Sequence, residues 1–193
     1  MRIRVNGNLE IPELDFRKLL DDIGNYMVSS VVRRIKEGVP PPDSPLTVLN
    51  KRGNRTLQDT GRLIKSIHYQ VKGSSVVIGT DRPFADVMQN GARITPKRAE
   101  KLAIPVGWRI RKSVERKGVA ATIEDLKRQG WRIFFTDRAI MGTKGKGKRK
   151  TTKVFFIRKE AVQIPARRFL YAAEKDKREI RRMIEEFVND SRA

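Results

Sequence analysis

The sequence has 193 residues and no cysteine, which excludes a disulfide framework and any zinc site built from thiolates. Its 43 lysine and arginine residues outnumber 22 aspartate and glutamate residues, giving a formal net charge of +21. A polyanionic partner is therefore expected: nucleic acid, an acidic protein surface or an anionic membrane. The length favours one domain over two very small ones. Because no stretch is apolar over the length of a signal peptide or a membrane span, we expect a soluble protein used in the cytoplasm unless it is exported.

The first third of the chain predicts a strand followed by a long helix. Residues 1–11 alternate weakly between polar and apolar side chains, as a short strand or hairpin does. From residue 13 to 36 apolar side chains recur at every third or fourth position, the period of an amphipathic helix. Gly38 and the prolines at 40–42 end that helix. Residues 45–55 predict a surface loop.

Residues 57–67 predict a junction between a short helix and a sheet. Asp59 or Thr60 can accept hydrogen bonds from the free N–H groups of a helix that begins near Gly61. The apolar residues of this segment share one helical face: Leu63, Ile64 and Ile67. Arg62 has no such local role, so we expect it to pair with a carboxylate of either long helix or to contact a neighbouring subunit.

The middle of the chain is rich in strand signals. Residues 67–71 and 76–80 predict a β-hairpin, and residues 83–91 predict a short helix between Pro83 and Gly91. Four further segments predict strands from their β-branched and aromatic content: residues 102–106, 131–136, 154–157 and 162–165. Thr122 and Asp125 have the spacing of a capping box before a two-turn helix.

A second long helix is expected at residues 167–188. These elements together predict an α+β fold in which an antiparallel sheet packs against an N-terminal and a C-terminal long helix. A single domain would then cover residues 1–193, with a basic insertion at about 93–159. Residues 142–153 contain six basic residues, no acidic residue and no large apolar side chain, so they predict a flexible loop.

The positive charge is concentrated in this insertion. Residues 93–117 contribute a net charge of +7 and residues 142–153 contribute +6, which is 13 of the 21 net charges. The loop contributes these basic side chains: Lys144, Lys146, Lys148, Arg149, Lys150 and Lys153. Such clustering is typical of a contact with a phosphate backbone that reads no base sequence. A solubilising surface or an arm that docks on an acidic protein explains it equally well.

The sequence offers little to support catalysis. His68 is the only histidine and lies on a predicted strand, so a histidine metal site or a catalytic triad has no second member. Residues 142–148 have the spacing of a phosphate-binding loop, but Arg149 stands where Ser or Thr would bind magnesium, and a strand follows. The obvious candidate carboxylates, two adjacent pairs and one single residue, lie on predicted helices: Asp21 and Asp22, Glu185 and Glu186, and Asp125. We therefore expect that the protein is not an enzyme and that it has no catalytic residue, no cofactor and no metal.

Four blocks of the sequence recur together in one known family. They comprise residues 57–67, 77–80, 84–91 and 164–170, and Pro45-Leu46 ahead of a basic loop fits as well. The signature positions are Asp59, Thr60, Gly61, Arg62, Leu63, Gly91, Pro165, Arg167 and Phe169. In order and spacing these blocks resemble the phage virion morphogenesis (tail completion) family of Mu-like tailed phages. The chain departs from the family pattern at Phe84, Met88 and Arg168, where Tyr, His and a second Pro are usual.

The resemblance implies a non-enzymatic structural protein of a phage or prophage, with an α+β fold. It implies a role in tail completion or head–tail joining, as tail terminator or connector, in the virion and in the host cytoplasm during assembly. Its partners would be other connector or tail proteins and further copies of the chain in an oligomeric ring. The resemblance implies no contact with a membrane. A ring around double-stranded DNA would give the basic loop a DNA-facing role. The net charge alone motivates an alternative, a stand-alone non-sequence-specific nucleic-acid-binding protein.

Overall fold

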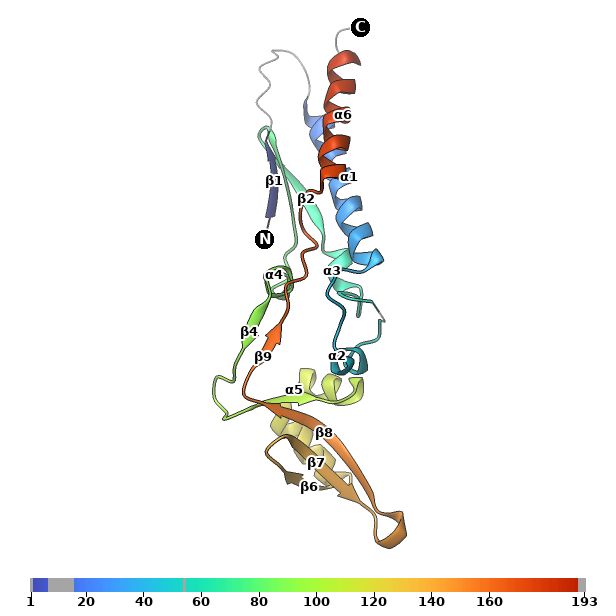
Figure 1. The fold of residues 1–193 in the computed structure, drawn as a ribbon, viewed down its shortest axis with the longest axis vertical. Coiled ribbons are helices and arrows are strands. Elements are labelled where there is room, and N and C mark those ends of the chain that lie inside the picture. The colour runs from blue at the N-terminus through green and yellow to red at the C-terminus, as the bar shows by residue number, and fades with distance from the viewer. Residues whose placement is uncertain (1, 7–15, 54, 191–193) are drawn as a thin grey trace. The chain divides into compact units, whose positions relative to one another are not determined.

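The computed structural model describes residues 2–6, 16–53 and 55–190, and the chain forms two compact units (Figure 1). The first unit comprises Met1–Pro42, Arg55–Gly91 and Pro165–Ala193, and the second comprises Asp43–Asn54 and Ala92–Ile164. The second unit thus contains the whole stretch 93–159 that the sequence marks as a basic insertion. That both units belong to one domain stays a prediction.

The first unit contains a three-stranded antiparallel sheet with the order β1-β3-β2. Its strands are β1 (Arg2–Asn6), β2 (His68–Lys72) and β3 (Ser75–Gly79). Strands β2 and β3 confirm the predicted hairpin, which turns at Gly73 with a φ of 57°. Strand β1 confirms the N-terminal strand, and residues 7–11 of that prediction lie outside the described part of the chain.

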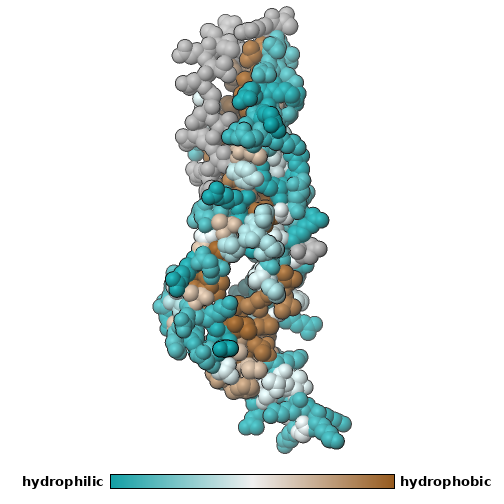
Figure 2. Space-filling view, viewed as in Figure 1, coloured by the Kyte–Doolittle hydropathy of each residue, from teal (hydrophilic) through white to brown (hydrophobic). Residues whose placement is uncertain are grey.

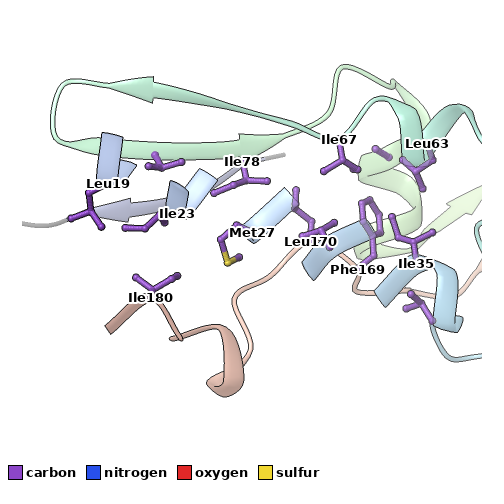
Figure 3. Packing of buried hydrophobic residues seen from close by; sticks show 14 residues of the cluster. Leu19, Ile23, Met27, Ile35, Leu63, Ile67, Ile78, Phe169, Leu170 and Ile180 are labelled. Carbon is purple, nitrogen blue, oxygen red and sulfur yellow. The ribbon is translucent and has the colours of Figure 1, made fainter. Parts of the chain in front are cut away.

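Helix α1 (Phe16–Glu37) confirms the first predicted long helix, whose residues 13–15 lie outside the described part. Its buried apolar side chains recur every four residues: Leu19, Ile23, Met27, Val31 and Ile35. They form one core with Val76 and Ile78 of β3 and with Phe169 and Leu170 (Figure 3). Gly24 lets α1 approach the sheet closely, because a Cβ atom there would overlap the ring of Tyr69.

Helix α6 (Glu174–Asp190) begins seven residues later than predicted, so the expected helix over 167–188 is wrong in its first part. Residues 165–173 run outside any helix. The backbone N–H groups of Phe169 and Leu170 donate to the side chain of Gln89 and not to carbonyls of a preceding turn. A side chain 80 residues distant therefore holds this segment in an irregular conformation that helical periodicity cannot indicate.

The carboxylate of Asp176 joins α1 to α6. It accepts hydrogen bonds from Ser30 Oγ at 2.6 Å, Tyr26 Oη at 3.2 Å and Arg34 Nη2 at 2.9 Å. It also accepts the backbone N–H of Ala173 at 2.8 Å, which caps the first turn of α6. Burial raises the pKa of Asp176, but these hydrogen bonds and the charge of Arg34 outweigh burial and hold that pKa below its usual value.

The second unit contains two further antiparallel sheets. One has the order β5-β8-β7-β6, and the other pairs β4 with β9. These strands are β4 (Ala92–Ile94), β5 (Leu102–Pro105), β6 (Arg132–Phe135), β7 (Ala139–Lys144), β8 (Thr151–Lys159) and β9 (Val162–Ile164). The α+β class and antiparallel pairing are confirmed, whereas the single sheet is corrected to three. The buried apolar residues divide between two separate cores, so the three-stranded and the four-stranded sheet each pack on a core of their own, and the residues of the β4–β9 pair belong to neither core.

Helix α5 (Trp108–Arg128) covers one face of the four-stranded sheet and bends at Gly118, where φ is 81°. Ile123 and Leu126 pack against Ile140 and Phe156 in the second core. The predicted capping role of Thr122 is wrong, because Thr122 lies inside α5 and its Oγ1 donates to the carbonyl of Gly118 at 2.8 Å.

Two predicted loops are partly ordered as regular structure. Helix α2 (Pro45–Asn50) lies within the predicted loop 45–55, and Ser44 Oγ caps it by accepting the N–H of Thr47 at 3.3 Å. Within the predicted loop 142–153, residues 142–144 pair with residues 151–153 across β7 and β8. Only residues 145–150 connect the two strands, and they include the short 3-10 helix η1 (Gly147–Arg149). Of the helices in the described ranges, none is long and apolar enough to cross a membrane.

Leu63→Ala is expected to lower the free energy of unfolding by about 2–5 kcal/mol, because it removes buried apolar contacts and leaves a cavity. Leu63 is 4% exposed in the first core. The measurement is urea unfolding followed by circular dichroism, because both tryptophans lie in the second unit. The matched control is Leu49→Ala, since Leu49 is 60% exposed on α2. Equal effects of the two substitutions would contradict this assignment of the core.

Asp176→Asn is expected to lower the free energy of unfolding at pH 7 by about 1.5–3 kcal/mol, because hydrogen bonds to a charged group are lost. Since the folded-state pKa of Asp176 is lowered, the stabilisation is complete above a pH of about 4 and is lost as the pH falls through the folded-state pKa. The difference between wild type and variant should therefore shrink in acid. Urea unfolding at several pH values measures this difference, with the exposed Asp22→Asn as control.

Candidate functional site

The signature block at 57–67 begins with a left-handed glycine. Gly61 has φ 75° and ψ 0° and precedes helix α3 (Arg62–Lys65), whose first backbone bond runs from Lys65 N to Gly61 O at 3.1 Å. The predicted cap by Asp59 or Thr60 is therefore wrong: the N-cap residue is Gly61, and no side chain caps the helix. A positive φ, which glycine adopts without a steric penalty, turns the chain into the helix instead.

The same block closes the C-terminal end of α1. Gln58 Nε2 donates to the carbonyls of Ile35 at 2.8 Å and Lys36 at 3.1 Å. Arg55 Nη1 donates to the carbonyl of Lys36 at 2.6 Å. These carbonyls belong to the last turn of α1 and have no partner within the helix, so the contacts explain why this block is tied to the first long helix.

Arg62 is exposed and makes no hydrogen bond or ion pair with any residue that the structure describes. Its predicted pairing with a carboxylate of a long helix is therefore wrong within those residues. The arginine of α1 that fills this role is Arg34, which binds Asp176 and also donates to the carbonyls of Phe169 and Tyr171.

Gln89 joins two other signature blocks. Gln89 is 3% exposed and lies on helix α4 (Phe84–Asn90). The helix ends at Gly91, whose φ is 75°. Gln89 Oε1 accepts the N–H groups of Phe169 and Leu170 at 3.0 Å each, and its Nε2 donates to the carbonyl of Leu170 at 3.1 Å. Sequence reasoning missed this role. The available signal was a polar residue four positions after the buried Ala85, on the inner face of a short helix.

Arg167 is the buried arginine of the last signature block. It is 5% exposed, and its Nε and Nη2 donate to the carbonyls of Pro41 at 2.9 Å and Pro42 at 3.2 Å. Its backbone N–H donates to Met88 O at 2.7 Å. Phe169, two residues on, is 1% exposed in the first core, whereas Pro165 is exposed. The signature positions therefore lie in the first unit, and the buried ones hold its backbone together.

The positive charge lies mainly in the second unit. That unit has 23 basic and 7 acidic residues, a net charge of +16, whereas the first unit has 20 and 15, a net charge of +5. Most of the acidic residues of the second unit pair with cations: Asp43 with Lys51, Glu100 with Arg158, Glu115 with Arg111, Glu124 with Lys127, Asp125 with Lys117 and Arg128, and Asp137 with Lys101. Among the described residues, the basic side chains of residues 142–153 take no part in these ion pairs.

The β7–β8 hairpin carries the six basic residues that the sequence singled out. Lys144 donates to the carbonyl of Gln129 at 2.7 Å, and Lys153 Nζ lies 5.6 Å from the centroid of the Trp131 ring. The other four are exposed and form no ion pair or hydrogen bond with the described residues through their side chains: Lys146, Lys148, Arg149 and Lys150. Four free cations at one hairpin tip form a surface that can bind phosphate groups without reading bases.

The residues considered for catalysis do not come together. His68 is exposed on β2, and its Nδ1 lies 2.9 Å from the carbonyl of Ser66. Strand β8 follows the glycine-rich turn, so no helix N-terminus faces an anion there. In the described ranges there is no group of three or more His, Asp or Glu side chains that could hold a metal ion. That the chain is not an enzyme stays a prediction.

Comparison with known proteins gives one match. Residues 5–154 match the model of the phage virion morphogenesis family. This range spans three of the four signature blocks and ends before residues 164–170. No curated protein and no solved structure matches the chain significantly.

Arg167→Ala is expected to lower the free energy of unfolding by about 1.5–3 kcal/mol or more, because two carbonyls lose a charged donor in a buried site. The matched control is the adjacent Arg168→Ala, since Arg168 is exposed. Arg62→Ala should likewise change the stability by less than about 0.5 kcal/mol, as expected of a surface site. Urea unfolding by circular dichroism compares the three variants. A loss at Arg62 equal to that at Arg167 would contradict the contacts described above.

Proposed function

Because this chain belongs to the phage virion morphogenesis family, with a structural role in virion assembly and other phage proteins as partners, we propose that it acts in tail completion at the head–tail junction. In this proposal it is a non-enzymatic component of Mu-like tailed phages or prophages. It assembles in the host cytoplasm and remains in the virion.

The observation that carries the proposal is the family match, and the distribution of charge supports its finer form. The buried signature residues hold the first unit together, while 16 of the 21 net charges lie in the second unit. A subunit of a ring around packaged DNA needs a rigid body for assembly and free cations that face phosphate groups. The tip of the β7–β8 hairpin supplies such cations. We therefore place this tip toward the DNA path in a homo-oligomeric ring.

The exposed Arg62 fits the same arrangement. It lies beside the buried Leu63 on α3, yet it makes no side-chain contact with a hydrogen-bonding or charged partner among the described residues. A guanidinium group with five donors is well suited to a carboxylate or carbonyls of another chain. We assign it to a contact with a neighbouring subunit in the ring.

Removal of the gene from a producing phage or prophage tests the role in assembly. Unjoined heads and tails, or tails of abnormal length, are expected in electron micrographs, and the wild-type gene should restore normal particles. Normal particles without the gene would contradict the proposal. Tight saturable binding of the isolated chain to duplex DNA at physiological salt, with normal particles, would favour a stand-alone nucleic-acid-binding protein instead.

Replacing the four free cations of the tip tests the DNA-facing role: Lys146→Gln, Lys148→Gln, Arg149→Gln and Lys150→Gln. Non-specific binding of duplex DNA should weaken, and the negative slope of log K against log salt should decrease in magnitude by about 3–4, because each phosphate contact contributes about −0.9. Fluorescence anisotropy at several salt concentrations measures this slope.

The matched control removes four exposed cations of the first unit: Lys65→Gln, Lys72→Gln, Lys175→Gln and Arg178→Gln. Both variants lose the same charge, so they separate the position of the cations from the total charge. An equal fall in slope for the two variants would show that the tip has no special part in DNA binding.

A further inference from the structure

The four-stranded sheet of the second unit has two different faces. Side chains alternate between the faces along each strand. One face packs on α5: Ile133, Ile140 and Phe156 belong to the second core or pack against it. Gly142 belongs to the same face, because a Cβ atom added at this position would meet the side chains of Phe155, Ile133 and Trp131. Alternation along β6 and β7 therefore assigns Phe134 and Met141 to the opposite face. On β8 a register shift opposite Ile140 and Met141 interrupts the alternation at Phe155, so Val154 is assigned to the opposite face by its pairing with Met141.

The opposite face is apolar and belongs to neither core. The register places Phe134 beside Met141, Met141 beside Val154, and Ile104 beside Ile157. These five residues, together with Leu102, are absent from both core clusters of the described chain. Phe134 is 39% exposed and Val154 is 36% exposed. Figure 2 shows apolar surface gathered over the part of the chain that contains these strands.

The same strands carry only positive charge. Across β5, β6, β7 and β8 there are five basic residues and no aspartate or glutamate: Arg132, Lys144, Lys153, Arg158 and Lys159. Lys159 is paired with Leu102 across β5 and β8, and Arg132 lies two residues before Phe134 on β6. The apolar row is therefore bordered by cations at both ends.

We propose that this sheet face, defined by Leu102, Ile104, Phe134, Met141, Val154 and Ile157, binds an acidic segment of another virion protein. Apolar side chains of that segment would cover the row, and its carboxylates would meet the bordering cations. The inference rests on the proposed function, because it takes the partner from among the other proteins of the particle.

Charge and chemistry favour this occupant over two others. A second copy would bring two units of net charge +16 face to face, which like-charge repulsion opposes. Duplex DNA offers phosphates to cations but nothing apolar to six apolar side chains, since its bases are stacked. An acidic segment with apolar side chains complements both features of the face at once.

Synthetic peptides test the proposal with the full-length chain. The probe is a fluorescein-labelled peptide in which leucine alternates with glutamate. Two comparison peptides replace leucine by serine or glutamate by lysine. Anisotropy titrations should show saturable binding of the probe, and this binding should weaken as the salt concentration rises. Each comparison peptide should bind more weakly than the probe by about tenfold or more, because it loses either the apolar contacts or the charge pairs. Equal binding of all three peptides would overturn the proposal.

Variants then locate the binding site. Phe134→Ser should weaken binding of the probe by about tenfold, as expected for one apolar side chain removed from an interface. Separately, Val154→Thr should weaken it by about fourfold, because a hydroxyl group replaces one methyl group. The control is Leu49→Ser, which removes an exposed apolar side chain on α2 and should leave binding unchanged. Unchanged circular dichroism and urea midpoints verify that each variant folds. Val154→Thr keeps a β-branched side chain and so retains the test if Phe134→Ser does not fold.

Two other outcomes would identify a different occupant of this sheet face. If sedimentation shows that the wild-type chain self-associates and that Phe134→Ser abolishes this, the occupant is a second copy and the proposal is overturned. If duplex DNA displaces the probe and Phe134→Ser weakens DNA binding equally, the occupant is nucleic acid and the proposal is again overturned. If the peptide test fails while deletion of the gene gives the expected unjoined heads and tails, only this inference is removed, because head–tail joining is measured independently.

Discussion

An ionised carboxylate buried between two helices is the constraint on which the first unit depends. Asp176 lies in the first turn of α6, and Ser30, Tyr26 and Arg34 of α1 all donate to it. A buried charge is costly unless each oxygen is satisfied, so α1 and α6 must meet in the one register that supplies these donors. The backbone N–H of Ala173 completes the set, and the same contact therefore decides where α6 starts.

The segment before α6 extends this principle to the rest of the unit. Residues 165–173 belong to no strand or helix of the described chain, yet their backbone groups are bound by side chains of α1 and α4. Gln89 pairs with Phe169 and Leu170, and Arg34 with Phe169 and Tyr171. Buried polar groups need such partners, so the irregular segment can cross the core. In the blocks that carry the family resemblance, Gln58, Gln89 and Arg167 thus act by satisfying backbone groups.

The second unit carries most of the net positive charge and an apolar sheet face outside its core. Its core needs only α5 and one face of a four-stranded sheet, which leaves the other face apolar and the β7–β8 hairpin basic. Few carboxylates remain unpaired in this unit, so the field of its cations is not cancelled locally. A structural role in virion assembly requires contact surfaces of this kind, and both surfaces lie on a body with its own core. The first unit can therefore remain intact while the contacts of the second vary.

The sequence by itself determined the class of fold, the helix α1, the β2–β3 hairpin and four strands of the second unit, β5, β6, β8 and β9, because periodicity and β-branched content are local properties. Strands β4 and β7 were not predicted. The sequence also determined the family, through blocks whose order and spacing are visible in one dimension. Only the tertiary structure decided the start of α6, the division into three sheets and the choice of Arg167 and Arg34 over Arg62 as internal contacts. Each of these depends on partners that lie far apart in the chain, such as Arg34 with Asp176 and Arg167 with Pro41. Local patterns carry no information about such pairs, since an exposed arginine and a buried one look the same until the carbonyls that receive them are in place.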